Sequence, residues 1–138
     1  MFLSLKTYIS PGIKEGAIEE KTVTGIRENE RFILLRENYD GVEVYPDFER
    51  FFPSITDRDS LSLSSRPPDF PINESMETKI KAVYPEIEYS VRVQLCMENE
   101  IEVYRLNRED FNRMRVGAVA KFELDRTERD LIKKVLEI

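Results

Sequence analysis

The chain has 138 residues, a formal net charge of −6, one cysteine and no histidine. This length fits one domain, or two very small halves that share a core. The missing histidine removes the commonest general base and metal ligand, and the single Cys96 excludes an intramolecular disulfide. The negative charge disfavours long-range attraction to nucleic acid and to anionic lipid.

The first half, residues 1–63, is predicted to be rich in strands, because alternating apolar and polar residues are separated by turn signals. Residues 1–9 alternate as a strand does, not as a basic-then-apolar leader, and no apolar run approaches the ~18 residues of a membrane span. A cytoplasmic location away from membranes is therefore expected. The predicted elements are strands over 2–9 and 17–26, a hairpin over 32–45, a helical turn over 47–52 and an edge strand over 60–64.

A stretch rich in proline and serine, residues 64–75, is predicted to be a linker or an ordered loop between the halves. Its three prolines remove backbone donors and oppose both helix and central strand. The second half, residues 76–138, is predicted to be β-rich as well, and the two halves can form one compact domain. Its expected elements are strands over 78–84, 87–95, 101–106 and 118–124, a short helix capped by Asn107, and a C-terminal helix that starts at Asp125 and packs through Leu131, Ile132, Val135 and Leu136.

Two hairpins echo each other in sequence, at residues 32–45 and 91–104. Both end in Glu-Val-Tyr, and each is followed by Asp-Phe-x-Arg. The pattern suggests a duplicated unit of hairpin, short helix and strand, although any two hairpins share alternation. The predicted class is mainly β, or α+β, with small antiparallel sheets or a barrel like OB and SH3 folds, and a C-terminal helix packed on the sheet. The likeness concerns only the order of the predicted elements and does not imply a function.

The residues that usually perform catalysis are missing from this sequence. The glycines stand singly and form no phosphate-binding motif, and one cysteine without histidine does not supply a zinc site. Asp57 and Asp59 offer oxygen ligands of the kind that Mg²⁺ and Ca²⁺ prefer, but a charged loop is the favoured interpretation. Cys96 is expected to be a small packed hydrophobic residue. We therefore expect no catalytic residue, no cofactor and no metal.

The most basic part of the chain lies near its C-terminal end, where arginines cluster around an aromatic residue. This candidate binding surface comprises Tyr104, Arg105, Arg108, Arg113 and Arg115. The favoured function is a non-enzymatic binding or assembly module that recognises a protein partner or associates with itself. One alternative is a small β-barrel that binds single-stranded nucleic acid through this basic face. A second is a metal-dependent enzyme built on carboxylates.

Overall fold

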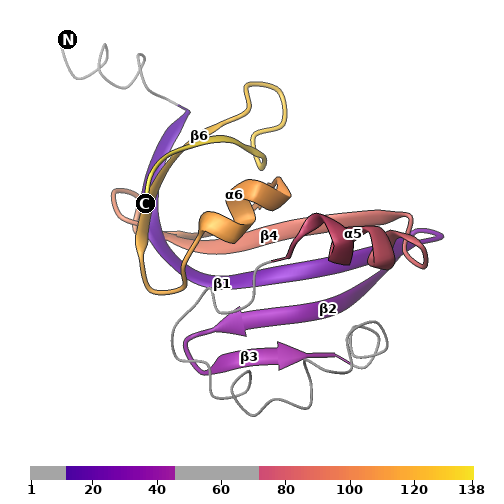
Figure 1. Ribbon diagram of the computed structural model, residues 1–138. Coiled ribbons are helices and arrows are strands. Elements are labelled where there is room, and N and C mark those ends of the chain that lie inside the picture. The colour runs from indigo at the N-terminus through magenta and orange to yellow at the C-terminus, as the bar shows by residue number, and fades with distance from the viewer. Residues whose placement is uncertain (1–11, 46–71) are drawn as a thin grey trace, which may run out of the picture.

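The computed structural model describes residues 12–45 and 72–138, which form seven strands and two helices (Figure 1). In this part of the chain the mainly β, α+β class is confirmed. The predicted elements over 2–9, 47–52 and 60–64 lie outside the described residues. In chain order the elements are β1 (Ile13–Arg27), β2 (Glu30–Asn38), β3 (Gly41–Val44), α5 (Glu74–Lys81), β4 (Glu86–Leu95), β5 (Ile101–Leu106), α6 (Arg108–Arg113), β6 (Val119–Leu124) and β7 (Ile132–Glu137).

These strands form one antiparallel sheet around the long strand β1. On one edge β1 pairs with β4; on the other it pairs first with β6, through residues 13–17, and then with β2, through residues 20–27. The strands β3, β5 and β7 extend the sheet beyond β2, β4 and β6. Because β6 and β2 occupy successive parts of one edge, β1 has to curve between them, as Figure 1 shows. A register shift between Ile18 and Glu20 lies where the partner changes.

The described sheet curls but does not close into a barrel. A single isolated parallel bridge, between Arg105 of β5 and Leu131 just before β7, links these two parts of the sheet without a continuous ladder. The Arg105 amide donates there to the Asp130 carbonyl over 2.8 Å. An open, strongly curved sheet is therefore observed, and the OB-like or SH3-like barrel stays a prediction.

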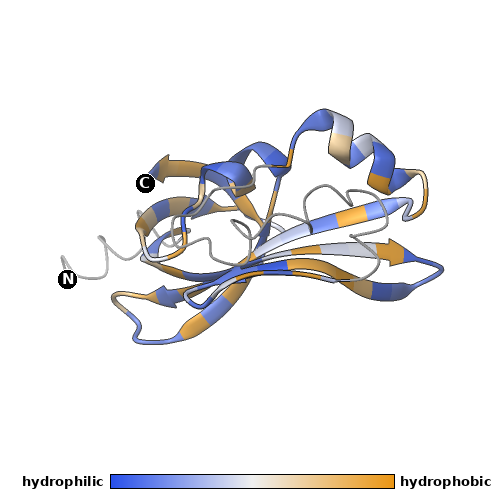
Figure 2. Ribbon diagram, turned by 60° about the horizontal axis from the view of Figure 1, so that its bottom comes forward, coloured by the Kyte–Doolittle hydropathy of each residue, from blue (hydrophilic) through white to orange (hydrophobic). Residues whose placement is uncertain are grey.

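Both helices lie on the same face of this sheet, over the core (Figures 1 and 2). Figure 2 shows apolar and polar residues alternating along the strands, which is why each strand has one buried and one wetter face. Phe111 of α6 packs on Tyr89 of β4 with 5.1 Å between ring centroids. Glu77 of α5 accepts hydrogen bonds from the Tyr89 hydroxyl at 2.8 Å and from Arg108 of α6 at 3.0 Å. One carboxylate thus joins both helices to the central part of the sheet.

Several local predictions are confirmed in this region. The alternation over 87–95 belongs to β4, in which Tyr89, Val91, Val93 and Leu95 are buried and Ile87 is partly buried. The strand predicted over 17–26 lies within β1, which extends further at both ends. Asn107 caps α6, because its side-chain oxygen accepts from the Asp110 amide at 2.7 Å.

The strand predicted over 78–84 is wrong, because residues 74–81 form helix α5. The Asn73 side chain accepts from the Met76 amide at 2.9 Å and starts the helix inside the segment taken as a linker. Met76 and Ile80, one turn apart, are both buried. Acidic residues in the first turn and lysines in the last also suit the helix dipole. These signals outweigh the short β-like pattern that suggested a strand.

The predicted C-terminal helix is also wrong, because residues 132–137 form strand β7 along the edge of β6. Asp125 does accept from the amides of Thr127 and Glu128, each at 2.9 Å, but it closes a turn and does not start a helix. Register shifts in the β6–β7 pairing place Ile132 and Val135, three residues apart, in the core together. That spacing imitates the period of a helix.

The internal duplication stays a prediction. Both hairpins exist, as β2–β3 and β4–β5. However, Tyr104 at the end of the second is buried, whereas Tyr45 at the end of the first is only half-buried. The helical turn expected after the first hairpin lies outside the described residues. The two predicted halves do share one sheet, since β1 pairs with β4 and with β6.

Candidate binding surface

The predicted basic surface contains an aromatic ring that faces the core. Tyr104 is 5% exposed, and its ring packs edge-on against Phe122 with 5.3 Å between centroids. Burial, together with the charges of Glu102, Glu98 and Glu100, raises the pKa of Tyr104 to about 12. In this arrangement the ring does not offer a free face for stacking on a base.

Three arginines of that surface are paired with carboxylates. Arg105 donates two hydrogen bonds to Asp130, at 2.8 and 2.9 Å, and this pairing raises the pKa of the guanidinium. Arg108 pairs with Glu77 at 3.0 Å, and Arg113 lies 3.5 Å from Asp110. Arg115 is exposed and contributes to the electrostatic surroundings of Lys21. The surface stays a prediction, but most of its charge is locally compensated.

The structure reveals a different surface, the outer edge of β5. The Leu95 amide donates to the carbonyl of Glu100 at 2.8 Å. This bond identifies which residue pairs of the β4–β5 ladder are hydrogen-bonded to each other, namely every second pair counted from this one. Amides and carbonyls of successive residues point to opposite edges of a strand. Arg105 uses the edge away from β4, since its amide bonds to Asp130. The backbone groups of Ile101 and Val103, which share its parity, therefore face outward as well.

No other strand covers this edge at Ile101 and Val103 among the described residues. The two side chains are 55% and 57% exposed, and Met97 in the preceding turn is 87% exposed. We name the segment from Met97 to Val103 the β5 edge. At Ile101 and Val103 it combines backbone groups that have no strand partner among the described residues with exposed apolar side chains, a combination that folded proteins usually shield.

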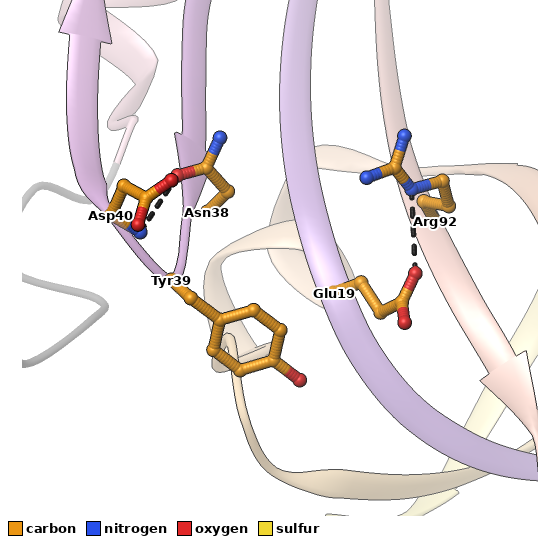
Figure 3. A pocket seen from close by; sticks show the side chains of 5 residues that line it. All are labelled: Glu19, Asn38, Tyr39, Asp40 and Arg92. Carbon is orange, nitrogen blue, oxygen red and sulfur yellow. Dashed lines mark hydrogen bonds and ion pairs between the residues drawn. The ribbon is translucent and has the colours of Figure 1, made fainter.

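The β5 edge continues across the outer face of the sheet to a shallow hollow. Arg92 of β4 lies opposite Val103 in the pairing and also lines this hollow, whose volume is about 210 Å³. Figure 3 shows Tyr39 extending from the β2–β3 turn toward Glu19, which in turn lies 3.5 Å from Arg92. Asn38 and Asp40 complete the lining. The hollow offers carboxylates, an amide, a phenol and a guanidinium, which suit polar contacts with a bound chain.

A buried amine, Lys21, lies on the opposite, inner face. It is 2% exposed, donates to the carbonyl of Met114 at 2.8 Å and lies 4.5 Å from the centre of the Phe111 ring. Burial lowers its pKa to about 8, although the charge of Glu37 acts in the other direction. These contacts hold α6 on the sheet, so Lys21 is a structural group without access to a substrate.

Cys96 is exposed, which corrects the expectation of a packed residue. The inward alternation of β4 ends at Leu95, and the turn to β5 begins at Cys96. Over residues 12–45 and 72–138 no group of three or more His, Cys, Asp or Glu side chains is placed to hold a metal ion. Asp57 and Asp59 lie outside those ranges.

Comparisons with known proteins give no relative from which a role could be transferred. No family model matches the chain, and neither a curated protein nor a solved structure is significantly similar to it. Neither helix of the described part is long and apolar enough to cross a membrane. The geometry of the chain itself is therefore the basis for inferring a function.

Proposed function

We propose that this chain is a non-enzymatic binding or assembly module that recognises a protein partner, and that the partner adds a strand to the β5 edge. The observation that supports this proposal is the combination at Ile101 and Val103 of outward backbone groups and exposed apolar side chains. An added strand would satisfy those groups and cover those side chains. Main-chain hydrogen bonds would then provide affinity, and side-chain contacts would provide specificity.

The nucleic-acid alternative has less support from the described residues. Tyr104 is buried, and Arg105, Arg108 and Arg113 are each paired with a carboxylate. Single-stranded binding through a basic track would weaken steeply with salt, whereas pairing of apolar strands would not. A salt titration with a labelled single-stranded oligonucleotide distinguishes the two.

The test uses one position with two substitutions. Val103→Pro removes a backbone donor that faces the open edge and leaves the β4 ladder intact. Val103→Thr keeps the donor and the branched shape. Tagged wild type and both variants are incubated with extract of the source cells, and the captured proteins are compared by quantitative mass spectrometry.

The proposal predicts a partner that wild type and Val103→Thr capture and Val103→Pro loses. Circular dichroism checks that the proline variant is folded. If it is not, Val103→Asp serves instead, because it keeps the backbone donor but removes the apolar contact. Identical capture by wild type and by a folded Val103→Pro or Val103→Asp variant would contradict docking at the β5 edge.

A further inference from the structure

The β5 edge is acidic as well as apolar, and this charge restricts what can bind to it. Glu98, Glu100 and Glu102 occupy every second position of the edge, and all three glutamates are exposed. Glu98 is paired with Lys14, whereas Glu100 and Glu102 have no ion pair in the described part of the chain. Burial and, after it, these same three carboxylates raise the pKa of the Tyr104 hydroxyl, which agrees with their position around one end of β5.

We propose that the segment docking on the β5 edge is a basic, extended stretch of a partner protein, in which Lys or Arg alternates with apolar residues. This inference rests on the proposed function and adds the chemistry of the partner. Successive side chains of a strand point to opposite faces. Ile101 and Val103 therefore share the outer face, and Glu100 and Glu102 the inner one.

An added strand aligns its own side chains beside those of β5, face by face. Its apolar residues would lie against Ile101 and Val103, and its residues of the other parity against Glu100 and Glu102. Opposite charges directly across a strand pair are stabilising, and like charges are destabilising. The alternation of β5 thus selects a partner with the matching alternation and positive charge.

The same charges disfavour a second copy of this chain as the occupant. Antiparallel pairing of Ile101 with its own copy would set Glu100 opposite Glu102. Pairing of Ile101 with Val103 of a copy would set Glu102 opposite itself. The net charge of −6 adds to this repulsion. A basic strand from another protein avoids both problems.

The test uses defined peptides with the full-length chain. A fluorescent peptide of alternating Lys and Val, its Glu–Val counterpart, and a Lys–Val peptide N-methylated along one edge are titrated by anisotropy. Variants are Glu100→Gln/Glu102→Gln and, as a control with the same change in net charge, Glu28→Gln/Glu30→Gln, two exposed residues in the β1–β2 turn and at the start of β2.

We expect the Lys–Val peptide to bind wild type and the turn control equally well. Glu100→Gln/Glu102→Gln should bind it roughly fivefold to tenfold more weakly, because two favourable cross-strand pairs are lost. The Glu–Val and N-methylated peptides should bind far more weakly than the Lys–Val peptide.

Equal binding of the Lys–Val and Glu–Val peptides, or equal losses for both double variants, would overturn the charge inference. If Val103→Pro still loses its cellular partner in that case, docking at the edge stands and the partner is not basic. If Val103→Pro keeps its partner, the proposed function itself fails.

Discussion

The buried amine of Lys21 should make the stability of this protein rise with pH. Below about pH 8 the lysine is protonated in both folded and unfolded chains, and the folded chain bears the full cost of a buried charge. Between about pH 8 and the ordinary lysine value of 10.5, only the unfolded chain stays protonated. Unfolding then takes up a proton, so raising the pH stabilises the fold.

The size of the effect follows from the two pKa values, about 8 folded and 10.5 unfolded. Proton linkage gives an increase in the free energy of unfolding of about 2 kcal/mol between pH 7 and pH 9.5. Above pH 10 the trend reverses, because the raised pKa values of Tyr89 and Tyr104 mean that tyrosines ionise first in the unfolded chain. The range below pH 10 is therefore the useful one.

Urea unfolding at a series of pH values measures this directly, with Lys21→Met as the comparison. The variant keeps the apolar stem of the side chain but cannot be protonated. It should lack the rise between pH 7 and pH 9.5 that wild type shows. Parallel pH profiles for the two proteins would refute the assignment of a depressed pKa to Lys21.

Three further substitutions test the packing of the described residues. Phe111→Ala should destabilise by about 3–5 kcal/mol in urea unfolding, because this buried ring anchors α6; a loss below 1 kcal/mol would deny that role. Gly25→Ala should lower stability by about 1–3 kcal/mol, since an added Cβ would lie 2.6 Å from the Tyr84 ring; an unchanged melting temperature would argue against that contact. Asn107→Ala removes the α6 cap and should cost about 1 kcal/mol by the same assay, whereas Asn107→Ser, which keeps a capping oxygen, should stay close to wild type.

The local sequence pattern was sufficient to predict a strand where that strand pairs regularly with its neighbour. In β4 the residues from Ile87 to Leu95 alternate without interruption, and the strand has one buried face as predicted. In β7 the pairing contains register shifts, so the buried Ile132 and Val135 have helical spacing although the chain is extended. Sequence periodicity does not separate these cases, because the shifts depend on how β6 and β7 pair.

The candidate surfaces depended on topology that local sequence does not show. The arginines near Tyr104 form a basic group in the sequence. In the structure, however, Arg105 pairs with a carboxylate in the segment just before β7, and Arg108 pairs with a carboxylate of α5. Ile101 and Val103 were recognised as strand residues. No described strand covers their edge, because β6 returns to β1 and not to β5, which is a property of the whole sheet.

Backbone hydrogen exchange at β5 tests the central claim most directly. In the free protein the amides of Ile101 and Val103 should exchange rapidly, whereas those of Glu102 and Tyr104, which face the β4 ladder, should be protected. Adding the captured partner should protect Ile101 and Val103. Protection of these two amides already in the free chain, or rapid exchange that persists in the complex, would contradict an open edge that binds a partner strand.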